Sequence, residues 1–148
     1  MNTYPSKTIE QSGIHKEVVC KENGRIFHLT NNSNSFIQKI KIDGALITTG
    51  IRCDYAVDVT KDKNESISDM IYLIELKGSD KAHACKQIIE TYNYFQNNYN
   101  ANTYNCRIVL SKDNAPKVIS TEQKKLLLLQ KQRKLNLLIQ SQKIEEVI

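Results

Sequence analysis

The sequence predicts an α/β (α+β) fold, in which a single domain is built on one central mixed β-sheet flanked by helices. The first observation behind this prediction is size, because 148 residues and 17.0 kDa are enough for one hydrophobic core. The second is composition, because 40% hydrophobic and 25% charged residues are typical of a globular domain. The third is order, because strand patterns come first and are followed by a helix, a strand, a helix and a last strand pattern.

The beginning of the chain carries the weakest signals. Residues 1–13 are polar and predict a flexible N-terminus. Residues 14–20 fit either a short helix or a strand. Residues 25–29 are mostly apolar and predict a short strand, and with it the core of the domain begins, which we expect to span about 25–110.

Two further strands and a turn are expected next. Residues 36–42 alternate apolar and polar side chains, which is the period of a half-buried strand. Asp43-Gly44 then predicts a two-residue hairpin turn leading into a strand at 45–48. Residues 52–60 alternate again and predict the strand after that.

The centre of the domain has the clearest pattern. Residues 70–74 follow a charged loop and form an apolar run of strand-forming residues, which predicts a central strand over 70–77. Ser79-Asp80 is a favourable N-cap position. Apolar residues at helical spacing then predict a helix over 81–95, and residues 104–110 predict a further strand.

The C-terminal part predicts one more helix and one more strand. Ser120 or Thr121 is expected to cap a helix that runs to about residue 135. Residues 135–140 then fit an edge strand, so the helix and this strand together occupy about 120–142.

Cysteine usage and hydropathy point to a cytoplasmic protein without a membrane partner. The four cysteines are far apart and have no zinc-ligand spacing, which predicts small buried thiols: Cys20, Cys53, Cys85 and Cys106. The N-terminal residues lack the pattern of a signal peptide, and no apolar run has the length of a membrane span. The sequence contains no glycine-rich phosphate loop, so no organic cofactor is expected.

Asp54 and the tripeptide Glu75-Leu76-Lys77 form the pattern that bears most on function. Side chains two residues apart on a strand point to the same face, so Glu75 and Lys77 are expected side by side. Burying such a pair has a desolvation cost, which favours a functional reason for it. Asp54 lies on the preceding predicted strand, and two carboxylates at one site can hold Mg²⁺.

In order and spacing these residues resemble the PD-(D/E)-x-K nuclease superfamily, which has the restriction-endonuclease-like fold. The resemblance covers about residues 36–110: a strand with Asp54, a hairpin, a strand with Glu75-x-Lys77, a helix and a further strand. Small Holliday-junction resolvases and restriction enzymes are similar in size and layout. Cys53 stands where many members have proline.

The resemblance implies a magnesium-dependent phosphodiesterase site, in which Mn²⁺ can substitute. Carboxylates and one backbone carbonyl would hold the ion, while an ammonium group and a helical amide would serve catalysis. The implied metal ligands are Asp54, Glu75, the carbonyl of Leu76, and Glu17 as an extra acidic residue, and the implied catalytic residues are Asp54, Glu75, Lys77 and Gln87.

Alternatives remain open at two of these positions. Glu10 and Glu22 are alternatives to Glu17, because no spacing selects one acidic residue near the N-terminus. Asp58 shares a strand face with Asp54 and is an alternative to it as a ligand.

The sequence therefore favours a Mg²⁺-dependent endodeoxyribonuclease that hydrolyses DNA phosphodiester bonds in repair, recombination or defence against mobile DNA. The net charge of +5 is compatible with a DNA partner. Lys124, Lys125 and Lys131 are expected to contact phosphates, with a solvated helix face as the alternative. The resemblance implies a homodimer. The rival hypothesis is an inactive nucleic-acid-binding or protein-interaction module on the same fold.

Overall fold

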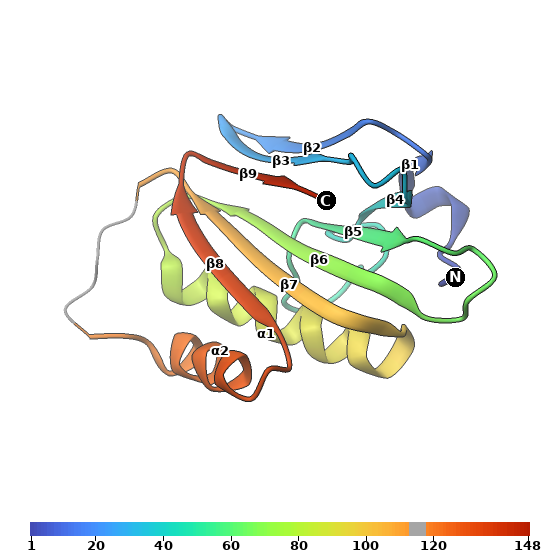
Figure 1. Cartoon of the computed structure of the whole chain (residues 1–148). Coiled ribbons are helices and arrows are strands. Elements are labelled where there is room, and N and C mark those ends of the chain that lie inside the picture. Colours follow the sequence, from blue (N-terminus) through green and yellow to red (C-terminus); the bar gives the residue numbers. More distant parts are fainter. Residues whose placement is uncertain (113–117) are drawn as a thin grey trace.

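The structure, a computed structural model, describes residues 1–112 and 118–148 as one α+β domain (Figure 1). It contains a six-stranded mixed sheet, a three-stranded sheet and two α-helices, so the predicted fold class is confirmed. The two helices lie on one side of the large sheet, and the small sheet lies on the other side. The elements in chain order are η1 (Ser6–Thr8), β1 (Ile9–Gly13), β2 (Glu17–Glu22), β3 (Arg25–Thr30), β4 (Phe36–Lys41), β5 (Tyr55–Thr60), β6 (Ser68–Lys77), α1 (Lys81–Asn98), β7 (Ala101–Leu110), α2 (Thr121–Lys131), β8 (Asn136–Ser141) and β9 (Lys143–Val147).

The large sheet has the strand order β1-β4-β5-β6-β7-β8. β4, β5 and β6 are consecutive antiparallel neighbours and form a meander. α1 then crosses back over the sheet, so β7 pairs parallel with β6, and β8 pairs parallel with β7. The predicted edge strand near residues 135–140 is therefore confirmed as β8.

Successive side chains of the central strands point to opposite faces of the large sheet, so the buried residues form two hydrophobic clusters, one on each face. Ile71 and Leu73 of β6 pack under α1 together with Ile88 and Phe95 of that helix. Their neighbours Tyr72 and Ile74 point the other way, toward the small sheet, whose order is β2-β3-β9. A central strand covered on both faces must be apolar on both, which explains the uninterrupted apolar run of β6.

The expectation of a flexible N-terminus is wrong. β1 pairs with β4, and the side chains of Asn2 and Tyr4 are buried. Buried Asp58 accepts hydrogen bonds from Asn2 Nδ2 at 3.0 Å and from the Tyr4 hydroxyl at 2.7 Å. The polar character of this segment reflects these buried hydrogen bonds, which hold the N-terminus on the sheet.

Three other boundaries also differ from the prediction. Residues 45–48 form a turn that closes with an isolated bridge between Asp43 and Ile47 instead of a strand, so the connection from β4 to β5 is a long loop. The second helix ends at Lys131, four residues early, because Arg133 adopts a positive φ of 59°. The hydrophobic interior extends beyond 25–110 to Val18 and Ile144, since the small sheet belongs to it.

Local signals at the helix starts were reliable. The Asp80 carboxylate accepts from the His83 backbone N–H at 3.0 Å, and the Ser120 hydroxyl accepts from that of Gln123 at 3.1 Å. All four cysteines are buried with free thiols, as predicted. Within residues 1–112 and 118–148, neither helix has the length and apolar character needed to cross a membrane.

Candidate functional site

Asp54 and Glu75 lie opposite each other where β5 begins and β6 nears its end. Tyr55 pairs with Ile74 in the antiparallel ladder, so the preceding residue Asp54 faces the following residue Glu75. The Asp54 carboxylate also accepts a hydrogen bond of 2.8 Å from the backbone N–H of Leu76. The structure thus brings together the two carboxylates that the sequence singled out.

Glu75 is an unusual side chain, because its carboxyl group is buried without full hydrogen bonding. The residue is 2% exposed, and its Oε2 has no hydrogen-bond partner. Burial, followed by the negative charge of Asp54, raises the pKa of Glu75 to about 9, while Lys77 opposes this shift. An unpartnered buried carboxyl oxygen is rare in folded proteins and marks a place where a cation or proton donor would be stabilised.

Asp54 is less buried and titrates at lower pH. Burial raises the pKa of Asp54 to about 6, and the hydrogen bond from the Leu76 N–H opposes the increase. Glu22 and Asp43 raise this pKa further, and Lys41 lowers it. At neutral pH the pair therefore holds one proton, mainly on Glu75, because two close carboxylates resist double ionisation.

Lys77 lies on the same face of β6 as Glu75, as residues two apart on a strand must. Its side chain is partly exposed, whereas Glu75 is buried, so the strand passes from the interior to the surface over these two residues. The positive charge of Lys77 lowers the pKa of Glu75, so the two side chains interact at this end of the strand.

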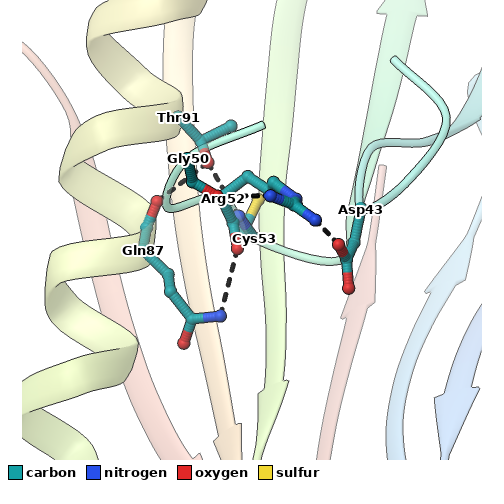
Figure 2. Close-up of polar contacts among 6 residues, drawn as sticks. All are labelled: Asp43, Gly50, Arg52, Cys53, Gln87 and Thr91. Carbon is teal, nitrogen blue, oxygen red and sulfur yellow. Dashed lines mark hydrogen bonds and ion pairs between the residues drawn. The ribbon is translucent and has the colours of Figure 1, made fainter. Parts of the chain in front are cut away.

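The chain segment before Asp54 is held against α1, as Figure 2 shows. Gln87 Nε2 donates to the carbonyl of Arg52 at 3.0 Å. The hydroxyl of Thr91, one turn further along the helix, accepts from the Cys53 N–H at 2.8 Å and donates to the carbonyl of Gln87. These bonds fix the backbone on which Asp54 is carried.

Arg52 adds an ion pair at the other side of this segment. Its Nε donates to Asp43 Oδ1 at 2.8 Å, and its guanidinium also bonds the carbonyl of Gly50 (Figure 2). Sequence reasoning named Gln87 but missed Thr91 and Arg52. The signal for Thr91 was its place one helical turn after Gln87, on the same face.

The expected acidic residue Glu17 does not reach the carboxylate pair. It lies on the small sheet beside His28, with 3.5 Å between Glu17 Oε1 and His28 Nε2. Glu22, at the opposite end of the same strand, is the N-terminal acidic residue whose charge acts on both Asp54 and Glu75. The strand length separates the two ends of β2, so only one of them can be near the site.

Asp58, the alternative to Asp54 as a metal ligand, is hydrogen-bonded to the N-terminal residues instead. It accepts hydrogen bonds from Asn2, Tyr4 and Thr60 and is 1% exposed. A carboxylate saturated by protein donors has few lone pairs left for a metal ion.

The predicted phosphate contacts Lys124, Lys125 and Lys131 are all exposed on α2. The first turn of α2 shares a surface hollow with the start of α1, lined in part by Asp80, Lys81, Ser120 and Gln123. Because β6 leads through Gly78 and Ser79 directly into α1, this end of α2 lies at the same end of the domain as Lys77.

The carboxylates of Asp54 and Glu75 are the kind of oxygen ligands that a divalent cation takes. Among the residues the structure describes, no cluster of three or more His, Cys, Asp and Glu side chains has metal-binding geometry. Mg²⁺ needs fewer protein ligands than that, because it keeps several waters and is held by one or two carboxylates. Asp54, the unpartnered Oε2 of Glu75 and the Leu76 carbonyl supply oxygen donors of the kind that such an ion prefers.

Comparison with known proteins found no similar family, curated protein or solved structure.

Proposed function

We propose that this protein is a Mg²⁺-dependent endodeoxyribonuclease of the restriction-endonuclease-like type. The observation that carries the proposal is the Asp54–Glu75 pair, in which Glu75 is buried with one carboxyl oxygen lacking a partner, with Lys77 beside it on the same strand. The order of elements adds support, because β5, β6, α1 and β7 follow each other as the resemblance implies.

In this proposal Asp54, Glu75 and the carbonyl of Leu76 hold a Mg²⁺ or Mn²⁺ ion. When bound, the ion supplies charge neutralisation at the phosphodiester and lowers the pKa of bound water. Lys77 stabilises the negative charge that develops on the phosphoryl oxygens in the transition state. Gln87 keeps the Arg52 carbonyl, and therefore the Asp54 backbone, in place.

Lys124 and Lys125 attract the DNA backbone near the carboxylate end of the domain, and Lys131 extends this charge along α2. The protein works in the cytoplasm, where four buried free thiols stay reduced. Two copies acting as a homodimer would cut both strands of a duplex, whereas a monomer would nick one.

The decisive experiment incubates the purified protein with supercoiled, linear and branched DNA in Mg²⁺, in Mn²⁺ and in chelator. Wild type is expected to convert supercoiled DNA to nicked or linear forms only with metal. Glu75→Gln and Asp54→Asn should be inactive, while Glu90→Gln, which removes an exposed carboxylate from α1, should retain full activity. Cleavage that persists in Glu75→Gln would refute the proposed site.

One observation favours the rival function, an inactive nucleic-acid-binding or interaction module. With a pKa of about 9, Glu75 is neutral at pH 7 in the metal-free protein, so the pair can be stable as a protonated core element. The rival predicts DNA binding without cleavage and no heat signal when Mn²⁺ is titrated. The enzyme hypothesis predicts a Mn²⁺ signal that disappears in Glu75→Gln.

A further inference from the structure

A second concave surface lies at the end of the domain opposite to the carboxylate pair. Three adjoining hollows of about 500, 250 and 180 Å³ share lining residues and form one groove between the end of α1, the start of β7 and the end of α2. Among the described residues that line it, none is acidic. Its character is set by Gln96 and Asn102, by the rings of Tyr92 and Tyr104 that meet edge-on, and by Arg133 and Lys134.

Arg133 occupies this groove in a costly backbone conformation. Its φ is 59°, and it follows the last helical turn in a Schellman arrangement, with Arg133 N–H bonded to the Gln130 carbonyl and Lys134 N–H to that of Leu129, both at 2.9 Å. Glycine is the usual residue here, because an L-side chain in the left-handed region costs about 1 kcal/mol. A strained arginine that lines a groove suggests a function that outweighs the cost.

The distance between the groove and the carboxylate pair follows from the β6–β7 ladder. Glu75 pairs with Ile108, and the groove residue Ala101 lies seven residues earlier on β7. At about 3.3 Å per residue the separation is roughly 23 Å. Duplex DNA rises about 3.4 Å per base pair, so roughly seven base pairs cover it.

α2 runs between these two ends and carries positive charge at each of them. Its first turn lies near the start of α1, and its last turn lines the groove through Leu129 and Gln130. Lys124 and Lys125 are near its first end, and Lys131, Arg133 and Lys134 are at its last. The helix therefore offers a polyanion cations at both of its ends, one group near each site, with the leucine-rich stretch 126–129 between them.

We propose that this groove, defined by Tyr92, Gln96, Asn102, Tyr104, Arg133 and Lys134, is a second nucleic-acid contact that grips the sugar-phosphate backbone about seven base pairs from the cleavage position. The inference rests on the proposed function for its ligand, since it assigns the groove to the same DNA. Arg133 and Lys134 bind phosphates, and the amides of Gln96 and Asn102 hydrogen-bond the backbone between them.

The test measures binding of a 16-base-pair duplex in chelator, so that no cleavage occurs, over a range of salt concentrations. Arg133→Gly combined with Lys134→Gln should weaken binding and reduce the salt slope by about 1.8, which corresponds to two phosphate contacts. Lys16→Gln, which removes an exposed charge outside the groove, should leave the slope within half a unit of wild type. An unchanged slope in the double variant would overturn the proposal.

Arg133→Gly alone separates binding from folding. Because glycine relieves the left-handed strain, this variant should melt at a higher temperature than wild type while binding DNA more weakly. Tighter or equal DNA binding by this variant would count against the groove. A polyglutamate chain of equal charge that binds as tightly as DNA would overturn the nucleic-acid assignment in favour of an acidic protein.

The groove proposal and the nuclease proposal can be refuted independently of each other. If Glu75→Gln abolishes cutting but the groove variants bind and cut a 16-base-pair duplex like wild type, the groove proposal is wrong and the nuclease stands. If wild type cuts nothing yet the groove variants lose DNA binding, the nuclease is wrong and the groove stands as a DNA-binding surface. For an active enzyme, the groove variants should raise KM for the 16-base-pair duplex and leave kcat/KM unchanged for a cross-linked 5-base-pair duplex, which is too short to reach both sites.

Discussion

Replacing Glu75 with glutamine is expected to stabilise the metal-free protein at neutral and alkaline pH. The pKa of Glu75 is about 9 in the folded chain and 4.5 for an ordinary glutamate. Below pH 4.5 the group is protonated in both states and its stabilising contribution is complete. As pH rises toward 9 the unfolded chain releases the proton while the folded chain retains it, so folding stability is lost over this interval.

The size of the effect follows from the same two values. A solution at pH 7 is about 2.5 pH units above the ordinary pKa of glutamate, and this interval corresponds to roughly 3 kcal/mol of lost folding stability. Glutamine cannot ionise, so Glu75→Gln should recover up to this amount at pH 7 and little of it at pH 4.5. Glutamine also keeps nearly the same shape, so the packing around position 75 should change little.

Urea denaturation of wild type and Glu75→Gln in chelator at pH 4.5, 6, 7 and 8 measures the difference directly. The variant should gain stability relative to wild type by up to about 1.4 kcal/mol per pH unit. Saturating Mn²⁺ should reverse the order at pH 8, because the ion stabilises only the wild type. A stability difference that is the same at pH 4.5 and pH 8 would show that Glu75 is not the buried neutral acid described here.

Other predictions follow from single contacts. Lys77→Ala should abolish DNA nicking while the salt slope of DNA binding changes by one unit or less, because the role proposed for the ammonium is in the transition state. A purely proportional loss of binding and cutting would contradict this role. Thr91→Val leaves the Cys53 N–H without its acceptor and should cost about 1–3 kcal/mol of stability in urea denaturation. The same variant should weaken Mn²⁺ binding in calorimetry, whereas Thr91→Ser should keep both properties near those of wild type. Equal behaviour of the two variants would exclude the hydroxyl as a positioning group for Asp54. Tyr4→Phe removes a 2.7 Å hydrogen bond to buried Asp58 and should cost about 1–3 kcal/mol of folding stability. Amide exchange at the N-terminus should also become faster. A stability change near zero would mean that this hydrogen bond does not anchor the segment.

Local patterns in the sequence were sufficient for the central elements and for the carboxylate pair. The alternation of residues 36–42, the apolar run before Glu75 and the helical spacing after Asp80 each depend on neighbours within one element, and all three elements formed as predicted. Asp54 and Glu75 meet because a meander places consecutive strands side by side and alternation sets the face. Burial could be expected from the apolar flanks, although the missing partner of Glu75 Oε2 could not.

The parts that sequence reasoning missed depend on contacts between distant segments. β9, near the C-terminus, pairs with β3, near the N-terminus. The buried polar residues Asn2 and Tyr4 donate hydrogen bonds to Asp58, which lies more than fifty positions away in the sequence. The charge of Glu22, and not that of Glu17, acts on Asp54, because the β2–β3 hairpin packed on the large sheet sets which end of β2 is nearer to it. The sequence by itself determined the elements and the chemical groups at the site, since propensity and alternation are local; the tertiary structure alone decided which acidic residues share that site, because packing of one sheet on another has no short-range signature in the chain.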